Sequence, residues 1–309
     1  IMGFYRQRSH DIIDMDSCLI QDEKHQQVMN DVKQLISELN ISVYNEKTKK
    51  GLLRHLVVRT GHYTNQMMII LVTNGKAFNQ ANQLVEALVK LHPNVTSIKQ
   101  NINDAHSNVI MGRKSITLYG TDEIEDKLSE ITFNISDQSF YQINSHQTEK
   151  LYNQALEYAQ LTGNEIVLDT YCGIGTIGLY MAEKSKHVYG VEVVSSAIKD
   201  AEENATINQL ENTTFVCGKA EEVILKWKAE GIRPDVVMVD PPRKGCDETF
   251  IKTLLELNPK RIVYISCNPS TQQRDAQLLS QQYDLKEITP VDMFPQTTHI
   301  ETVALFDRK

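Results

Sequence analysis

One cysteine lies where a strand is expected to end and a helix to begin. In "YISCNPST", residues 264–271, an apolar run leads to Cys267, and Asn268 followed by Pro269 is typical of a helix start. A thiol just before a helix N-terminus is favoured as thiolate by the helix dipole, so Cys267 is a candidate nucleophile. The simpler interpretation of one such residue is a buried thiol that fills space.

A glycine-rich segment predicts a nucleotide-type ligand. Gly173, Gly175 and Gly178 in "YCGIGTIG" match G-x-G-x-x-G directly after an apolar strand pattern. Glycines at this position let the backbone approach a ligand closely. Glu192 ends the next strand pattern and is placed to accept hydrogen bonds from ribose hydroxyls. The pattern predicts an adenosine-bearing ligand, and NAD and S-adenosylmethionine (SAM) both qualify.

Two further carboxylates favour SAM over NAD. Asp169 closes the strand before the glycines, where its charge disfavours a pyrophosphate and suits the cationic amino-acid part of SAM. Asp240 begins "DPPRKG", and the paired prolines restrict the chain that follows it. An ordinary exit from a strand into a turn is the alternative interpretation of Asp-Pro-Pro.

The elements that must position these residues alternate between strands and helices after a helix around 145–160. Several strands are wholly apolar, which is typical of a parallel sheet covered on both faces. The last two strands have a short link and are expected to pair antiparallel. The fold prediction is therefore α/β, with a Rossmann-like seven-stranded, mostly parallel sheet whose last strand is antiparallel, as in class I SAM-dependent methyltransferases. The expected strands are 165–169, 187–193, 213–218, 235–240, 261–267, 285–294 and 302–308.

The residues before about 137 have a different order of helix and strand patterns, which predicts a smaller α+β domain. Its pattern gives a helix over 24–39 and then a β-β-α-β-β unit between 53 and 120. The acidic stretch 120–130 is expected to be an exposed connection. We place the boundary near Asp137, so that residues 1–136 form a central domain and residues 137–309 form a catalytic domain.

The predicted topology brings the candidate residues to one edge. Carboxyl ends of parallel strands meet at the working edge of such a sheet, and the reversed last strand begins there. That strand starts at "HIETV", which brings Glu301 towards Cys267 and Asp240. A thiolate that adds to C6 of uracil makes C5 nucleophilic towards a methyl donor, and a base must then remove the C5 proton. Cys267 would be the nucleophile and Glu301 the base, while Asp240 could orient the pyrimidine. A surface carboxylate is the simpler interpretation of Glu301.

Five motifs, in order and spacing, resemble one family. They are "SFYQIN" (139–144), "DTYCGIGTIGL" (169–179), "VDPPRKG" (239–245), "ISCNPST" (265–271) and "HIETVALF" (299–306). Together they resemble the TrmA/RumA-type RNA uracil-5 methyltransferases, and residues 3–21 resemble the central domain of the ribosomal RNA branch. The resemblance implies 5-methyluridine formation with 23S rRNA as the expected target, Cys267 as nucleophile and Glu301 as base. It also implies SAM contacts from Gln142, Tyr171, Glu192 and Asp240, and no metal ion at this site.

The chain departs from the family pattern in two respects. Ribosomal members usually carry an N-terminal TRAM domain, and nothing here corresponds to it. Many also bind a [4Fe–4S] cluster through four cysteines, of which Cys18 resembles the last, while the others would precede Ile1. We therefore expect a fragment that begins inside the central domain. The full-length protein could hold a cluster with Cys18 as one ligand, and none is expected in this chain.

Composition sets limits on partners and location. The net charge is −8, but residues 1–136 hold 15 basic and 15 acidic side chains, so residues 137–309 carry the excess. Basic clusters at 3–8 and 47–59 could hold RNA phosphates. Five cysteines without regular spacing argue against a disulfide framework and fit a reducing cytoplasm. We expect an RNA partner, no membrane segment and no obligate protein partner.

Other functions stay open at the level of sequence. The same chemistry could act on tRNA. An amino-group methyltransferase would use Asp-Pro-Pro without needing Cys267, and a catalytically silent RNA-binding protein would keep SAM as a structural ligand. An NAD-dependent oxidoreductase would bind NAD in preference to SAM. Cys267→Ala would abolish uracil methylation but would leave an amino-group methyltransferase active. A direct comparison of NAD and SAM binding would test the oxidoreductase alternative.

Overall fold

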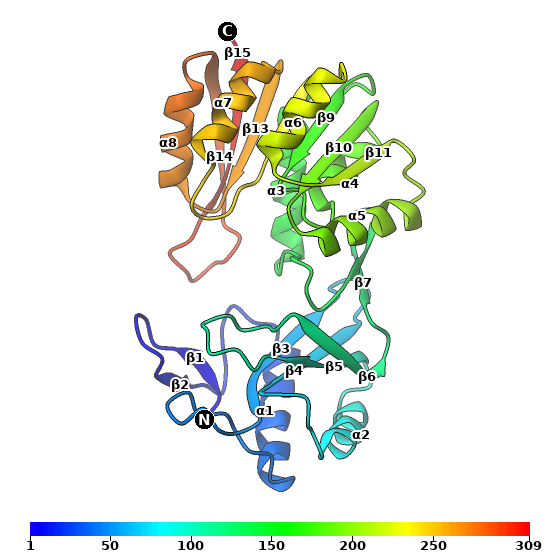
Figure 1. Cartoon of the computed structure of the whole chain (residues 1–309), viewed down its shortest axis with the longest axis vertical. Coiled ribbons are helices and arrows are strands. Elements are labelled where there is room, and N and C mark those ends of the chain that lie inside the picture. The colour runs from blue at the N-terminus through cyan, green and yellow to red at the C-terminus, as the bar shows by residue number, and fades with distance from the viewer. The chain divides into compact units, whose positions relative to one another are not determined.

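The computed structural model describes all residues, 1–309, and divides them into two compact units (Figure 1). The first unit comprises Ile1–Asp126 and Ile135–Gln138. The second comprises Lys127–Asn134 and Ser139–Lys309. The chain thus passes between the units more than once, and each unit has its own hydrophobic core.

The first unit is a four-stranded sheet with two helices. The sheet order is β3-β4-β5-β6, and β4 pairs parallel with β5 while the other neighbours are antiparallel. Its core is formed by apolar side chains of β4 and of both helices, because every β4 residue is buried and each helix has one apolar face. The bounds are α1 Glu23–Glu38, β3 Leu53–Thr60, β4 Met67–Thr73, α2 Ala81–Leu91, β5 Val95–Ile102 and β6 Lys114–Gly120.

Two short strand pairs were not expected from the sequence. β1 (Gly3–Tyr5) and β2 (Ile12–Asp14) form a small antiparallel pair. The expectation of an exposed connection over 120–130 was wrong, because β7 (Ile124–Leu128) pairs there with β8 (Ile131–Ile135). Ile124, Asp126 and Leu128 all point inward, and the buried Asp126 accepts a hydrogen bond from the Tyr63 amide (2.9 Å). Because the charged Asp126 occupies an inward position, the sequence lacks the alternation of apolar and polar side chains that is typical of a strand.

The second unit contains the predicted seven-stranded sheet. Its order is β11-β10-β9-β12-β13-β15-β14. β15 is antiparallel to the other six strands, which share one direction. The predicted class I methyltransferase topology is therefore confirmed. The bounds are β9 Ile166–Thr170, β10 His187–Glu192, β11 Thr213–Cys217, β12 Val236–Val239, β13 Arg261–Ser266, β14 Tyr283–Val291 and β15 Glu301–Arg308.

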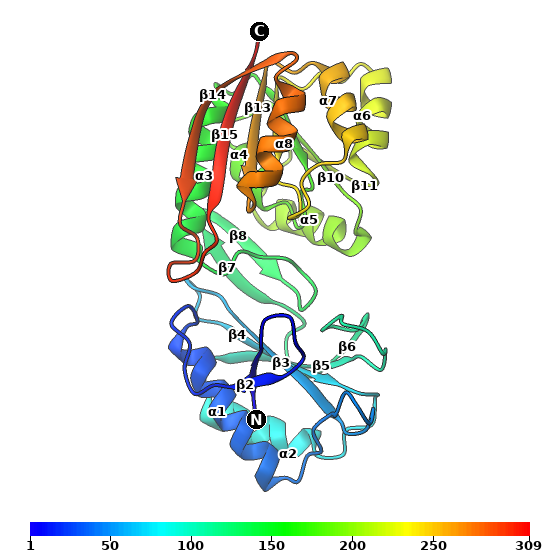
Figure 2. The ribbon, with the colours of Figure 1, turned by 90° about the vertical axis from the view of Figure 1, so that its left-hand side faces the viewer.

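Helices cover both faces of this sheet (Figure 2). On one face lie α3 (Ser145–Ala159), α4 (Thr176–Ala182) and α5 (Ser195–Ile207). On the other lie α6 (Ala220–Ala229), α7 (Glu248–Leu257) and α8 (Pro269–Leu279). Because both faces are covered, β12 and β13 are buried along their whole length, which explains their continuous apolar runs.

Candidate active site

The carboxyl ends of the parallel strands hold most of the predicted site residues. Asp169 lies within β9, Glu192 ends β10, and Asp240 and Cys267 directly follow β12 and β13. The last pair of the β13–β15 ladder is Ser266 with Thr302, so Cys267 and Glu301 are the next residues on two adjacent strands. The structure thus brings a thiol and four carboxylates to one edge, as the topology predicted.

Cys267 is held at the start of α8. Asn268 is the N-cap, and its side chain accepts a hydrogen bond from the Ser270 amide (3.2 Å) while donating to the Arg243 carbonyl (3.1 Å). The pKa of the Cys267 thiol is raised, first by burial and then by the charges of Glu301 and Asp240, while Arg243 lowers it. Burial and the two carboxylates thus act against the helix dipole, which favours the thiolate.

The two carboxyl groups beside this thiol are also perturbed. Burial raises the pKa of Asp240 to about 7, and the charge of Glu301 adds to the shift. Burial raises the pKa of Glu301 as well, and Arg243 acts in the opposite direction. The Arg243 guanidinium lies 3.3 Å from a ring nitrogen of His299. Carboxyls with raised pKa values at a concave sheet edge are suited to proton transfer near neutral pH.

The glycine turn after β9 is open at its centre. Tyr171, Gly173 and Gly175 all have left-handed backbone, with φ of 61°, 54° and 83°. A Cβ on Gly173 would meet no atom within 4 Å, which leaves room for a ligand against the backbone. The side chain of Asn204, on α5, donates to the Ile174 carbonyl (3.2 Å) and so fixes the turn.

Asn204 was missed by the sequence analysis. It is fully buried, and its side-chain oxygen also accepts a hydrogen bond from the Asn134 amide (2.8 Å). An asparagine at a buried position of an amphipathic helix is the signal that could have identified it, since a buried amide needs partners.

Asp169 carries an unsatisfied buried oxygen. Its Oδ2 accepts the Gly178 amide (2.7 Å), but Oδ1 is buried without a hydrogen-bond partner. Burial raises the pKa of Asp169 to about 8, and the charges of Asp240 and Glu192 contribute. A cationic group near Oδ1 would relieve this cost, because a buried carboxylate is stabilised by an opposite charge.

The remaining predicted SAM contacts have different surroundings. Glu192 accepts hydrogen bonds from the Val193 and Val194 amides through Oε1 (2.7 and 3.0 Å), so its carboxylate is fixed at the strand end. The Tyr171 ring packs against Phe250 of α7, with ring centroids 5.4 Å apart. Gln142 is half-buried in the segment before α3.

Near Gln142, Asn144 ties that segment to the site. Its side chain donates to the Met293 carbonyl (2.9 Å), in the loop that leads to β15 and Glu301. The segment 139–144 is therefore fastened to the strand that carries the candidate base.

Cys18 lies apart from the other cysteines in the chain. It is in the first unit, in the loop before α1, and its carbonyl accepts a hydrogen bond from Gln26 (2.7 Å). All four other cysteines belong to the second unit, and none joins Cys18 in a group able to ligate a metal. The first unit thus supplies one thiol, whereas a [4Fe–4S] cluster takes four.

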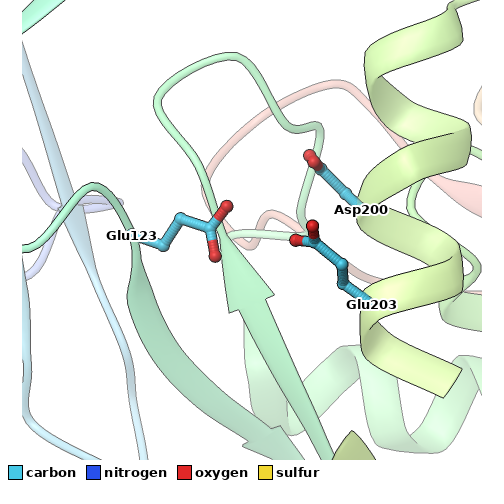
Figure 3. A group of neighbouring side chains, drawn as sticks. All are labelled: Glu123, Asp200 and Glu203. Carbon is cyan, nitrogen blue, oxygen red and sulfur yellow. The ribbon is translucent and has the colours of Figure 1, made fainter. Parts of the chain in front are cut away.

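Acidic side chains on α5 do not make a metal centre either. Asp200 and Glu203 lie one turn apart on this helix (Figure 3). Asp200 accepts a hydrogen bond from Ser139 (2.9 Å), and Glu203 pairs with Lys199 (3.1 Å). Glu123, the third carboxylate in that figure, belongs to the first unit, so the second unit contributes two carboxylates that already have partners.

A hollow of about 400 Å³ lies at the opposite edge of the sheet. Arg233, Lys260 and Arg308 line it, beside the starts of β12 and β13. None of the predicted site residues lines this hollow. Its position at the amino ends of the strands separates it from the candidate active site.

Comparisons with known proteins identify the family. The family model described as tRNA (Uracil-5-)-methyltransferase matches residues 5–309. An uncharacterized RNA methyltransferase of Staphylococcus epidermidis is 78% identical over 309 residues, which cover all of this chain and 68% of that protein. A Staphylococcus aureus counterpart is 76% identical over the same shares. The chain belongs to the tRNA (uracil-5-)-methyltransferase family.

Solved structures agree with this assignment. The Pyrococcus abyssi tRNA (uracil-54, C5)-methyltransferase, determined with S-adenosyl-L-homocysteine, has a TM-score of 0.82 and 32% identity, covering 98% of this chain and 72% of that one. The tRNA m1G37 methyltransferase of M. jannaschii has a TM-score of 0.53 and 14% identity, covering 86% and 78%, and shows the fold alone. As a member of the uracil-5 methyltransferase family, the chain is a SAM-dependent RNA methyltransferase.

The site of this family member fits SAM in two respects. The open turn at Gly173 leaves space against the backbone, and the orphan oxygen of Asp169 provides negative charge for a cationic ligand. In the helices of this structure there is no segment both long enough and apolar enough to span a bilayer.

Proposed function

We propose that this chain methylates C5 of a uridine in RNA, with Cys267 as the nucleophile and Glu301 as the base. The observation that carries the proposal is the position of these two residues, one step past the last paired residues of β13 and β15, with Asp240 on the neighbouring strand. SAM would supply the methyl group, and Gln142, Tyr171, Glu192 and Asp240 are the proposed contacts to it.

The proposed chemistry is balanced at the uracil ring. Cys267 sulfur adds to C6, and the C5=C6 electrons move towards the C4 carbonyl to give an enolate. C5 would then attack the methyl carbon of SAM, the bond between that carbon and the sulfonium sulfur would break, and S-adenosylhomocysteine would leave as a neutral thioether. Glu301 removes the C5 proton, the C5=C6 double bond returns, and the C6–S electron pair goes back to Cys267. Asp240, close to both groups, would hold the pyrimidine edge.

The protonation states of the free site bear on the first step. Cys267 has a raised pKa, so its proton must leave when the substrate binds. Burial raises the pKa of both nearby carboxyl groups, and repulsion from Glu301 adds to the shift of Asp240. A cationic ligand would weaken that repulsion and lower the pKa values of the whole group. We therefore expect SAM to bind before Cys267 becomes reactive.

We propose 23S rRNA as the target. Residues 3–21 resemble the central domain of the ribosomal branch, and this supports the choice. tRNA is the second candidate, because the P. abyssi relative of known structure is a tRNA (uracil-54, C5)-methyltransferase. We propose that residues 1–136 contact the RNA, that residues 137–309 carry out catalysis, and that the protein works in the cytoplasm.

RNA that contains 5-fluorouridine tests the chemistry. Fluorine at C5 cannot leave as a proton, so the protein with SAM should form a covalent RNA adduct, seen as a shifted band on a denaturing gel. Cys267→Ala should abolish the band, and Glu301→Gln should retain it while losing product formation on ordinary RNA. The test uses both 23S rRNA fragments and tRNA, and the RNA that is trapped identifies the substrate. SAM and RNA binding without any adduct in the wild type would favour a silent RNA-binding protein.

A further inference from the structure

A buried glutamine on α8 joins the strands of the candidate nucleophile and base. Gln272 is 4% exposed. Its Nε2 donates to the Tyr264 carbonyl on β13 (2.9 Å), and its Oε1 accepts from the Thr302 hydroxyl on β15 (2.8 Å). Both hydrogen-bonding ends of the amide are therefore used, one on each strand.

We call these two hydrogen bonds of Gln272 the bridge. The residues that it joins are close in sequence to the proposed reacting groups. Tyr264 is three residues before Cys267, and Thr302 follows Glu301. Ser266 and Thr302 form the last pair of this ladder, so β13 and β15 are no longer paired with each other beyond it. The arrangement of Cys267 against Glu301 thus depends on contacts at this end of the ladder, and Gln272 supplies one of them.

The two sides of the bridge are not equally supported. Cys267 is followed by the N-cap Asn268, which is also bonded to the Arg243 carbonyl. On the β15 side the backbone of Glu301 is paired with Val291 of β14, but the Thr302 hydroxyl has only one other partner, the Ser266 carbonyl at 3.4 Å. Loss of the Gln272 amide should therefore disturb the Glu301 side more than the Cys267 side.

We propose that Gln272 is a positioning residue that sets Glu301 for removal of the C5 proton. This inference rests on the proposed function. A general base must lie within hydrogen-bond reach of the proton it removes, so a small displacement of Glu301 slows that step. Addition of Cys267 precedes it and is affected less. The predicted signature is a covalent RNA–protein adduct that accumulates on ordinary uridine.

Two substitutions of different severity test this role. Gln272→Leu removes both hydrogen bonds, and Thr302→Val removes the hydroxyl alone while keeping a β-branched side chain in the strand. Gln273→Leu, on the exposed face of the same helix, is the matched control. Thr302→Val retains the Gln272–Tyr264 hydrogen bond, so it still tests the bridge if Gln272→Leu fails to fold.

The experiment compares turnover with trapping. For both variants we expect kcat to fall about tenfold, with KM for RNA and SAM within about twofold of the wild type. Trapping on 5-fluorouridine RNA should keep its wild-type rate, and the adduct on ordinary RNA should increase. Gln273→Leu should match the wild type.

Three results would contradict the inference. Turnover of Thr302→Val at the wild-type rate would show that the bridge does not act on Glu301. Trapping that slows as much as turnover would assign Gln272 to overall stability of the site. A rise in KM with unchanged kcat would assign it to binding. Absence of trapping by the wild type would instead refute the proposed function itself, so the two failures are distinguishable.

Discussion

Buried carboxyl groups define the candidate site at the level of single residues. Asp169 is fully buried, and the pKa values of Asp240 and Glu301 are both raised. Burial favours the protonated form of each group, since an ionised carboxylate is costly away from water. Burial of these carboxyl groups costs free energy when no ligand is bound. A cationic ligand would reduce that cost, which is a physical reason to expect tight binding of a sulfonium compound.

Asp169→Asn should make stability less dependent on pH. The pKa of Asp169 is raised to about 8, whereas an unfolded aspartate ionises near 3.9. Between these values the unfolded state loses the proton first, so wild-type stability falls with rising pH by up to about 1.4 kcal/mol per unit and then levels off. The variant lacks this loss, so its melting temperature relative to the wild type should rise from pH 5 to pH 8.

Thermal unfolding at several pH values measures this difference. Asp284→Asn, an exposed aspartate on β14, is the control and should run parallel to the wild type. If Asp169→Asn also runs parallel to the wild type, the carboxyl is already ionised in the folded protein.

At the level of elements, α8 fastens the loop that follows Asp240. Asp275 is fully buried and accepts hydrogen bonds from the Cys246 amide (2.8 Å) and the Tyr264 hydroxyl (2.7 Å). Arg274 donates to Asp275 and to the Cys246 carbonyl (2.9 Å). One helix thus holds the loop after β12 as well as the ends of β13 and β15, and it links three parts of the candidate site.

Gly245→Ala should destabilise the second unit. Gly245 has φ of 76°, and a Cβ there would lie 2.6 Å from the Arg274 guanidinium and 2.8 Å from the Asp275 carboxylate. Left-handed backbone and overlap with a buried group together should cost about 2 to 4 kcal/mol.

Gly231→Ala provides a matched control in urea unfolding. Gly231 has φ of 88° but no atom within 4 Å of its Cβ position, so about 1 kcal/mol is expected. Equal losses for the two variants would mean that backbone conformation alone matters, and that the loop is not tightly held by α8.

At the level of the whole molecule, the net charge is distributed unevenly along the sequence. The net charge of −8 lies in residues 137–309, so the proposed RNA contact depends on basic groups before Asp137. Lys47, Lys49 and Lys50 are exposed on a turn that Asn45 organises by accepting the Lys47 and Thr48 amides (2.9 and 3.0 Å). A structured turn with three exposed lysines is suited to phosphate contacts.

Replacing Lys47, Lys49 and Lys50 by Ala should weaken RNA binding and its dependence on salt. Each lost phosphate contact reduces the slope of log affinity against log salt by about 1, so a reduction of about 2 to 3 is expected. Filter binding at several salt concentrations gives the slope, and SAM affinity should stay unchanged.

The control replaces Lys199, Lys219 and Lys226 by Ala. All three belong to the second unit and form local ion pairs. The pairs are Lys199–Glu203 (3.1 Å), Lys219–Glu222 (3.2 Å) and Lys226–Glu230 (3.9 Å). An equal reduction in slope for this control would place the RNA contact on the second unit instead.

The sequence alone determined the sheet, its order of elements and the residues at its working edge. Apolar runs, glycine turns and helix caps are local patterns, so strands β9 to β15 were predicted within a few residues, and the short link before β15 predicted its direction. The topology followed from these elements, because parallel strands with covering helices have few arrangements. Asp169, Glu192, Asp240, Cys267 and Glu301 could therefore be assigned to one edge before any coordinates were known.

Only the tertiary structure decided the surroundings of the Cys267 thiol and the partners of buried polar groups. The helix start suggested a thiolate, but burial and the charges of Glu301 and Asp240 raise the pKa. Gln272 looked like one more polar residue of a helix, yet its amide joins β13 to β15. Such effects come from residues far apart in the chain, and their size depends on burial, which a local pattern does not contain.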